Sequence, residues 1–173
     1  MVFVATLGAR LFLPHPRSHS LGWMIHVGND FPKPIEDRLQ SWDVTLVIER
    51  ESDEPSTRGL LEYKDTTFGP GDISPIWLPP FYRYGPGDKP DAKVVDPTGA
   101  GNTFLGAFAA GYLQTGSIVE AACYGSVGAS FALEQVGMPE RSNDGEEELW
   151  NGTNVFSRLH EYRKTIGLPD IHR

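Results

Sequence analysis

A glycine-rich turn near the middle of the chain holds the residue types best suited to chemistry. The segment 96–102 reads Asp-Pro-Thr-Gly-Ala-Gly-Asn and follows two valines typical of a strand end. Glycine at positions 99 and 101 permits a sharp turn and leaves backbone N–H groups uncovered by side chains. Such groups at a helix start, aided by the helix dipole, form a site for an anion such as phosphate. The spacing is equally typical of a strand-to-helix turn that serves packing alone, so both interpretations stand.

Asn102 limits what this turn can catalyse. Its amide has no useful basicity near neutral pH, so it cannot serve as a general base. Asparagine is also a favourable helix N-cap, and we interpret its side chain primarily in that role.

The residues before the turn predict a strand–helix–strand unit. Residues 1–13 are apolar or small and predict a helix that ends before Pro14. Residues 22–27 and 44–49 have the composition of strands, and residues 34–42 between them fit a short helix. This order predicts a βαβ unit in a parallel sheet.

Helices are predicted after the turn. The first covers 102–113, with an apolar face at 104, 105, 108 and 112. Ser117 and Glu120 form a capping box that opens a second helix, which ends near residue 136 with Gly137 as its left-handed cap.

The remaining residues predict an acidic loop and a last helix. The loop covers 140–148, and its glutamates at 146–148 are interpreted as a solvated helix start. Thr153 or Asn154 caps the final helix, whose inward side chains are predicted to be Val155, Phe156, Leu159, Tyr162 and Ile166.

Composition narrows the function classes. The chain has 173 residues and a net charge of −8 without a Lys/Arg cluster, which argues against nucleic-acid binding. Its longest apolar run, 104–113, is half of the roughly 20 residues that span a bilayer, so we expect a cytoplasmic protein without a membrane segment. The histidines show no ligand spacing, since His15 and His19 flank Pro16 and share no helix face; no metal site is predicted from them.

The segment 96–102 resembles the second signature of the PfkB/ribokinase-like carbohydrate kinases, Asp-Thr-x-Gly-Ala-Gly-Asp. Asp96, Gly99, Ala100 and Gly101 match it. Proline replaces the usual threonine at 97, and Asn102 stands where the family has its catalytic aspartate. The loss of such a base typically slows a reaction by about 10²- to 10⁴-fold. Phosphoryl transfer depends chiefly on positioning and electrostatics, so weak activity is compatible with asparagine. The Asp-Pro-Thr-Gly-Ala-Gly-Asn form is similar to a fungal branch of the family. The resemblance implies an incomplete three-layer α/β/α fold with a mostly parallel sheet.

The resemblance also implies a reaction and its cofactors. Relatives transfer the γ-phosphate of ATP to an alcohol, usually a sugar hydroxyl, with Mg²⁺. Position 102 and the N–H groups of Gly99, Ala100 and Gly101 would then form the catalytic site. Asp96 would lie beside a monovalent cation such as K⁺. The nucleotide would contact Gly99, Gly101, Ser126, Val136 and Gly137.

The chain is shorter than a complete relative, so the resemblance implies a truncated or internally deleted member. We predict that residues 1–68 derive from the N-terminal, substrate-side half and that 93–173 form the nucleotide half. The Pro/Gly-rich stretch 69–92 is interpreted as a connection or deletion seam. The segment 143–146 matches the letters of the family's Mg²⁺ motif, Asn-x-x-Glu, but we interpret the match as coincidence.

Three hypotheses follow. The first is an ATP-dependent phosphotransferase acting on a sugar or other alcohol, weak or inactive in this form. The second is a catalytically silent nucleotide-binding or protein-interaction remnant of the same fold. The third is an unrelated α/β domain with a chance glycine turn. Sheet edges stripped of central strands would expose apolar surface, which is compatible with a homo-oligomer.

Overall fold

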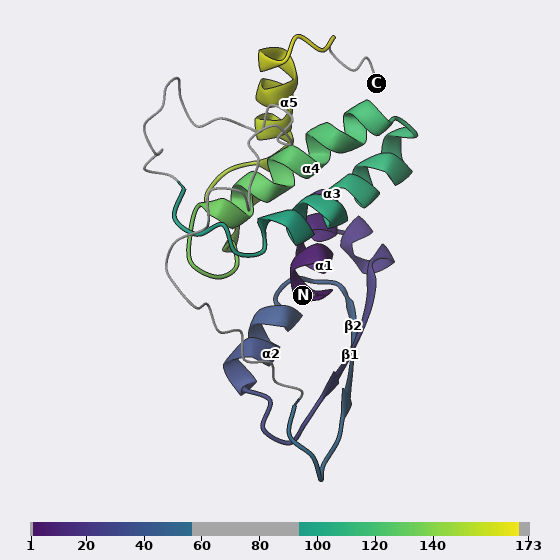
Figure 1. Cartoon of the computed structure of the whole chain (residues 1–173), viewed down its shortest axis with the longest axis vertical. Coiled ribbons are helices and arrows are strands. Elements are labelled where there is room, and N and C mark those ends of the chain that lie inside the picture. Colours follow the sequence, from purple (N-terminus) through teal and green to yellow (C-terminus); the bar gives the residue numbers. More distant parts are fainter. Residues whose placement is uncertain (1, 57–93, 170–173) are drawn as a thin grey trace, which may run out of the picture.

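The computed structural model of this chain describes residues 2–56 and 94–169 (Figure 1). Helices and strands are mixed, and one sheet is parallel, which confirms the predicted α/β class. The predicted connection 69–92, and the end of the segment 1–68, lie outside the described residues.

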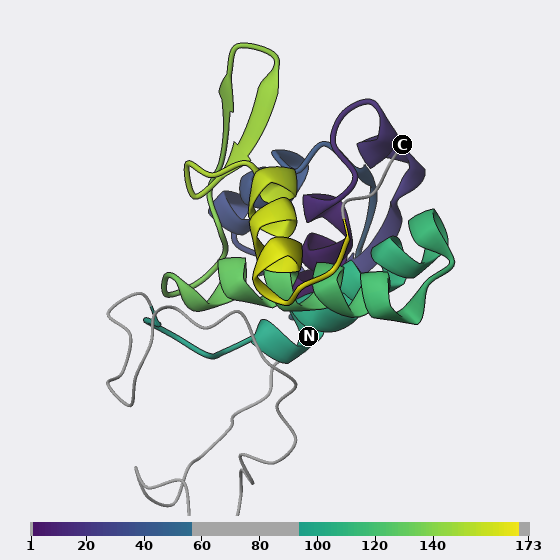
Figure 2. The ribbon, with the colours of Figure 1, turned by 90° about the horizontal axis from the view of Figure 1, so that it is seen from above.

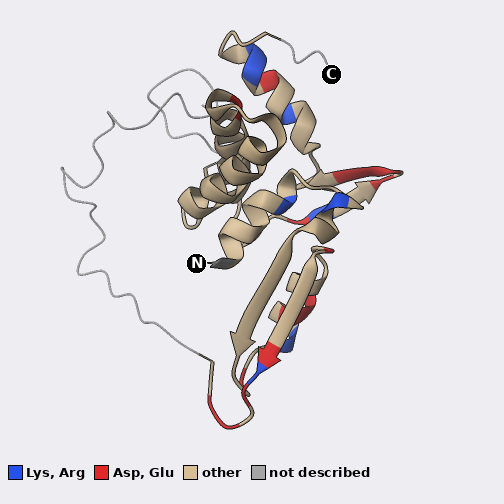
Figure 3. Cartoon of the chain, turned by 90° about the vertical axis from the view of Figure 1, so that its right-hand side faces the viewer, with Lys and Arg blue, Asp and Glu red and all other residues tan. Residues whose placement is uncertain are grey.

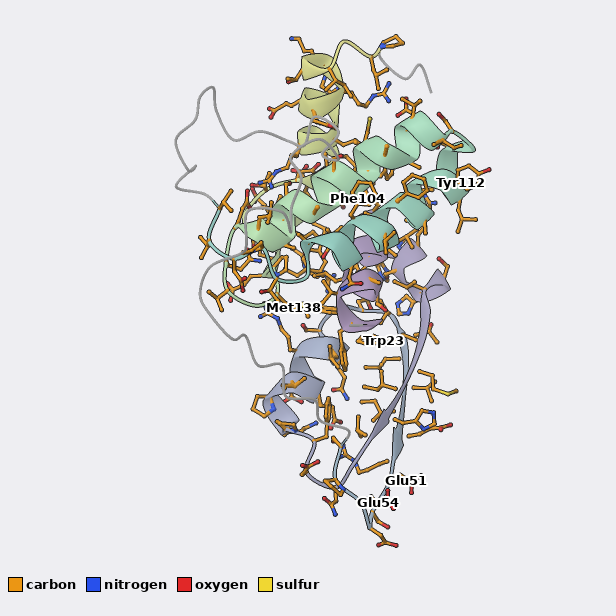
Figure 4. The ribbon with its side chains drawn as sticks, viewed as in Figure 1. Trp23, Glu51, Glu54, Phe104, Tyr112 and Met138 are labelled. Carbon is orange, nitrogen blue, oxygen red and sulfur yellow. The ribbon has the colours of Figure 1, made fainter. Side chains whose placement is uncertain are left out.

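The predicted βαβ unit is present. β1 (Gly22–Val27) pairs in parallel with β2 (Thr45–Arg50), and α2 (Lys33–Gln40) connects them. β1 alternates exposed and buried residues, so one of its faces packs on the core. Trp23 lies where the sheet meets the helices (Figure 4), with its ring stacked 5.7 Å from that of Trp42.

Three helices form a layer above this sheet: α1 (Val2–Leu11), α3 (Ala100–Thr115) and α4 (Ile118–Leu133) (Figure 1). α1 and α3 approach so closely that side chains are excluded between them. A Cβ on Gly8 would lie 2.1 Å from the Thr103 carbonyl oxygen, and one on Gly106 would lie 1.8 Å from that of Ala5. These glycines therefore set the distance between the two helices.

The buried face of α3 differs from the predicted one. Of the four residues predicted to form this face, Leu105 is 62% exposed and Tyr112, near the end of α3 in Figure 4, is 47% exposed, whereas Phe104 and Phe108 are half-buried. Because α3 lies between the backbones of α1 and α4, only small side chains fit there. Its buried residues are Thr103, Gly106, Ala107, Ala110 and Gly111.

The Ser117 half of the predicted capping box is confirmed and the Glu120 half is not, because the Ser117 N–H donates to the Thr115 hydroxyl oxygen at 3.2 Å and the Glu120 carboxylate pairs with Arg163. The Ser117 hydroxyl accepts a hydrogen bond from the Glu120 N–H at 3.3 Å and opens α4. α4 ends at Leu133 rather than near 136, and its C-cap is Glu134, so the predicted cap role of Gly137 is wrong; Gly137 has its positive φ of 91° in the turn beyond.

The last helix, α5 (Val155–Thr165), begins as predicted. Its cap is Asn154, whose side chain accepts from the Ser157 N–H at 2.8 Å. Of the side chains predicted to point inward, Ile166 is 36% exposed, because it follows the end of the helix. Val155, Leu159 and Tyr162 are buried.

An antiparallel hairpin replaces the predicted acidic loop and solvated helix start at 140–148. β3 (Arg141–Asp144) pairs with β4 (Glu147–Trp150). The hairpin projects beside α5 and carries acidic side chains toward its tip (Figures 2 and 3).

Glu148 on this hairpin reaches the interior and pairs with a buried arginine of α1. Its two carboxylate oxygens accept hydrogen bonds of 2.8 and 2.6 Å from Arg10, which is 0% exposed. Arg10 also donates to the backbone oxygens of Leu13 and Trp42. This ion pair therefore joins α1 to β4 across the core.

Within the two described ranges, no helix has both the length and the apolar character that a membrane span needs. α3 carries no charged side chain and α4 carries one, Glu120 (Figure 3).

Candidate functional site

The glycine-rich turn opens α3, as predicted. Gly99 is the residue before the helix and has φ 88° and ψ −10°, a left-handed conformation that other residues rarely adopt. A Cβ at this position would also lie 2.9 Å from Cγ1 of Val4 on α1. The Thr103 N–H and hydroxyl both donate to the Gly99 carbonyl, at 2.9 and 3.1 Å, and hold the turn against the helix.

The turn leaves several backbone N–H groups available. Ala100 donates its N–H to the Pro97 carbonyl at 3.2 Å. Those of Gly99, Gly101 and Asn102 have no hydrogen-bond partner among the described residues. Beyond the helix's own backbone, no atom of the described residues lies within 4 Å of the Cβ position of Gly101, so this side of the turn is open within the described part of the chain. Uncapped N–H groups at a helix start, with the helix dipole, favour a bound anion.

The two polar side chains of the turn differ in their surroundings. Hydrogen bonds from the Thr98 hydroxyl and N–H lower the pKa of Asp96, so its carboxylate is ionised at neutral pH. Asn102 is half-buried and is the third residue of α3, not its cap. The predicted N-cap role of Asn102 is therefore wrong, because Gly99 occupies that position.

The end of α4 lies against this turn. The N–H groups of Val95 and Asp96 both donate to the Leu133 carbonyl, at 2.8 and 3.2 Å. The turn that contains Val136 and Gly137 follows Leu133 directly, so two predicted contact regions for a nucleotide share one end of the helical layer. Val136 is 79% exposed there.

Ser126, also predicted to contact the nucleotide, lies on α4 two turns before this end and is 4% exposed. It is thus part of the core. The hairpin segment 143–146 extends on the side of α5 away from the start of α3 (Figure 2). A cleft of about 900 Å³ lies near the other end of α3, lined by Leu113 and Gln114 among others.

The structure also gathers polar residues that sequence reasoning kept apart. The rings of His15 and His19 have centroids 5.6 Å apart, and Asp43 contacts both. The two histidines share no helix face, as the sequence indicates. They meet because the chain turns between Pro14 and η1 (Arg17–Ser20). The sequence carries no local signal for Asp43, which arrives from the end of α2.

Comparison with known proteins finds a family match that includes the turn. Residues 86–143 match the family described as "pfkB family carbohydrate kinase". The chain is 47% identical over 73 residues to an uncharacterized protein of Schizosaccharomyces pombe, and the match covers 42% of this chain and 20% of that protein. It is 41% identical over 80 residues to the protein MAK32 of Saccharomyces cerevisiae, covering 46% of this chain and 22% of that one.

A third relative has a named activity. The chain is 41% identical over 49 residues to inositol 3-kinase of Arabidopsis thaliana, covering 28% of this chain and 14% of the kinase. No solved structure matches the chain significantly. The chain thus spans about a fifth or less of the length of these relatives. The family match over 86–143 includes the turn at 96–102, so this segment is similar to part of a PfkB-family carbohydrate kinase domain.

Proposed function

We propose that this chain binds ATP through the start of α3 and acts as a weak ATP-dependent phosphotransferase with an alcohol acceptor. The observation that carries the proposal is the set of N–H groups at Gly99, Gly101 and Asn102 that have no partner in the described residues. A phosphoryl group that gains negative charge during transfer is stabilised by such preorganised donors. The family match over the same turn supports a carbohydrate-kinase type of reaction.

The residues of the turn fit a phosphate better than they fit a base-catalysed reaction. The helix dipole and N–H groups supply positive potential, while Asn102 cannot accept the proton of the acceptor hydroxyl. Asp96 is the ionised group of the turn and is the residue that we propose for a cation, K⁺. ATP would bind here as its complex with Mg²⁺, so the metal ion would arrive with the nucleotide. We infer that the site positions the phosphate but does not remove the proton of the acceptor hydroxyl efficiently, so turnover is slow.

Nucleotide binding is tested with Gly101→Asp. The new side chain has space, and it places a negative charge beside the N–H groups. We expect ATP affinity, measured by calorimetry, to fall by an order of magnitude or more, about 1.4 kcal/mol per tenfold. Ser117→Asp is the matched control, because it adds the same charge at the start of α4 and keeps a residue favoured at N-caps. Equal ATP binding by both variants would exclude this site.

Catalysis is tested with Asn102→Asp. If the chain is an enzyme limited by its missing base, phosphorylation of an alcohol should accelerate by about 10²- to 10⁴-fold. Myo-inositol and simple sugars are the acceptors to try first, since one relative is named inositol 3-kinase. The turnover number and the KM for ATP are measured separately, because the added charge also weakens phosphate binding.

A second candidate function is a silent nucleotide-binding remnant, which Asn102 itself favours. This candidate predicts that wild-type protein and Asn102→Asp both bind ATP and that neither consumes it with any acceptor. If Gly101→Asp binds ATP as tightly as the wild-type chain does, both candidates are rejected.

A further inference from the structure

Two imidazoles and one carboxylate converge at the junction between α1 and the sheet. Nδ1 of His15 lies 3.1 Å from Oδ2 of Asp43, and Nε2 of His19 lies 3.1 Å from Oδ1 of the same carboxylate. All three side-chain ligand atoms fall within 4.8 Å of one another. His15 comes from the loop after α1, His19 from η1, and Asp43 from the turn after α2.

The carboxylate is held in place from behind. Ser18 is 0% exposed, and its hydroxyl donates to Oδ2 of Asp43 at 3.0 Å. The backbone of Asp43 has φ 57°, a left-handed conformation that is uncommon outside glycine. Its N–H donates to the Gln40 carbonyl at 3.2 Å, and Trp42 beside it is 1% exposed. The fold therefore fixes Asp43, while the two histidines approach it from the surface.

We propose that His15, His19 and Asp43 bind a divalent transition-metal ion of the Zn²⁺ type. Neutral imidazole and carboxylate are ligands that Zn²⁺ uses, with metal–ligand bonds of about 2.0–2.2 Å. In tetrahedral geometry, bonds of that length place neighbouring ligand atoms roughly 3.4 Å apart. The two observed nitrogen–oxygen separations, one to each oxygen of Asp43, are 3.1 Å and close to this value, and the three ligand atoms lie within 4.8 Å of one another.

The surroundings match those of a metal site with accessible coordination. The Ser18 hydrogen bond to Asp43 is an outer-shell contact of the kind that orients a ligating carboxylate. Three protein ligands leave a fourth position for water or another small molecule. His15 and Asp43 also line an open cleft of about 570 Å³, which the β3–β4 hairpin closes on one side through Arg141 and Glu146. A molecule bound to the metal would therefore have space.

The experiment is a calorimetric titration of the untagged full chain with Zn²⁺, repeated with Co²⁺ while its visible absorption is recorded. We expect one ion per chain and a Co²⁺ spectrum of tetrahedral or five-coordinate type. The loss of an outer-shell partner typically lowers metal affinity by roughly 10- to 100-fold. Because His19→Ala and Asp43→Asn each change a direct ligand, each should lower the Zn²⁺ affinity by at least that factor. Both changes preserve the fold, because His19 is exposed and asparagine tolerates the left-handed backbone of Asp43.

His26→Ala is the matched control. His26 pairs with Glu49 at 3.0 Å on the sheet surface, so it reproduces the exposed His–carboxylate pair without a third ligand. Its loss should leave Zn²⁺ binding unchanged. The single cysteine, Cys123, is 3% exposed in the core and does not compete for the ion.

Thermal unfolding provides a second measurement. Because an ion that binds the folded state raises the melting temperature, Zn²⁺ should stabilise the wild-type chain and His26→Ala, but not Asp43→Asn. The proposal is overturned by any of three results: no stoichiometric Zn²⁺ binding, equal binding by wild type and His19→Ala, or equal weakening by His26→Ala.

Discussion

Replacing Glu148 by glutamine should destabilise the fold strongly, because it leaves the Arg10 guanidinium buried without its counter-charge. Arg10 is 0% exposed, and the Glu148 side chain is 11% exposed. Removing one partner of such a buried pair typically costs about 3–5 kcal/mol, whereas an exposed pair contributes roughly 0–1 kcal/mol.

The contacts place the expected loss near the lower end of that range. Arg10 keeps its hydrogen bonds to the Leu13 and Trp42 carbonyls, and the glutamine carbonyl still accepts one hydrogen bond from Arg10. Arg141, which donates to Glu148 at 2.8 Å, is more exposed and adds little. We therefore expect a loss of about 3 kcal/mol, which is a large fraction of the roughly 5–15 kcal/mol that stabilises a typical domain.

Urea unfolding followed by circular dichroism measures this loss. Glu147→Gln is the control, because it removes the same charge from the exposed neighbour on β4 and should change stability by less than about 0.5 kcal/mol. The double variant Arg10→Met/Glu148→Leu should recover much of the loss, since neither charge is then buried alone. Equal midpoints for Glu148→Gln and Glu147→Gln would refute the reasoning.

Three further predictions concern the same fold. Burial raises the pKa of Glu148, but hydrogen bonds and charge from Arg10, with Trp150 and Arg141, outweigh burial and lower it below the usual 4.5. The stabilisation should thus be complete above about pH 4.5 and decline as the pH falls through the lowered value, and Glu148→Gln should flatten this part of a pH–urea profile. Gly106→Ala should lower the free energy of unfolding in urea by about 2 kcal/mol, because the added methyl group overpacks against α1. Gly101→Ala, whose Cβ position is open among the described residues, should instead raise the free energy of unfolding by up to about 1 kcal/mol. Ser117→Ala should lower the melting temperature by removing the cap of α4, a loss of about 1 kcal/mol.

The elements that the sequence predicts well are those encoded by local patterns. β1 has the predicted bounds, and β2 differs by one residue, because runs of β-branched and aromatic side chains mark strands locally. The caps at Ser117 and Asn154 follow from hydrogen bonds within four residues of chain. Helix starts of this kind need no tertiary contact to be recognised.

The elements that the sequence predicts poorly depend on contacts between distant residues. Leu105 and Tyr112 look inward by their spacing, yet α3 turns its glycines and alanines toward α1 because the two backbones meet there. The acidic composition of the hairpin predicts a solvated segment, but Glu148 accepts a hydrogen bond from the buried Arg10, which lies 138 positions away in the sequence. The cluster around Asp43 has the same origin, since its histidines lie 24 or more positions earlier in the chain.

The two glycines of the turn allow its packing and anion-binding interpretations to be separated. Gly99 is required by the fold alone, because its φ is positive and Val4 occupies the space of a side chain. Gly101 is not: its φ lies outside the left-handed range, and in residues 2–56 and 94–169 no atom beyond the helix's own backbone approaches its Cβ position. Alanine would favour the helix there, so packing gives no reason for glycine at 101. Anion binding does give a reason for glycine at 101, because a phosphate would need an unobstructed path to the N–H groups of Gly101 and Asn102. The packing interpretation therefore explains one glycine, whereas the anion-binding interpretation explains both.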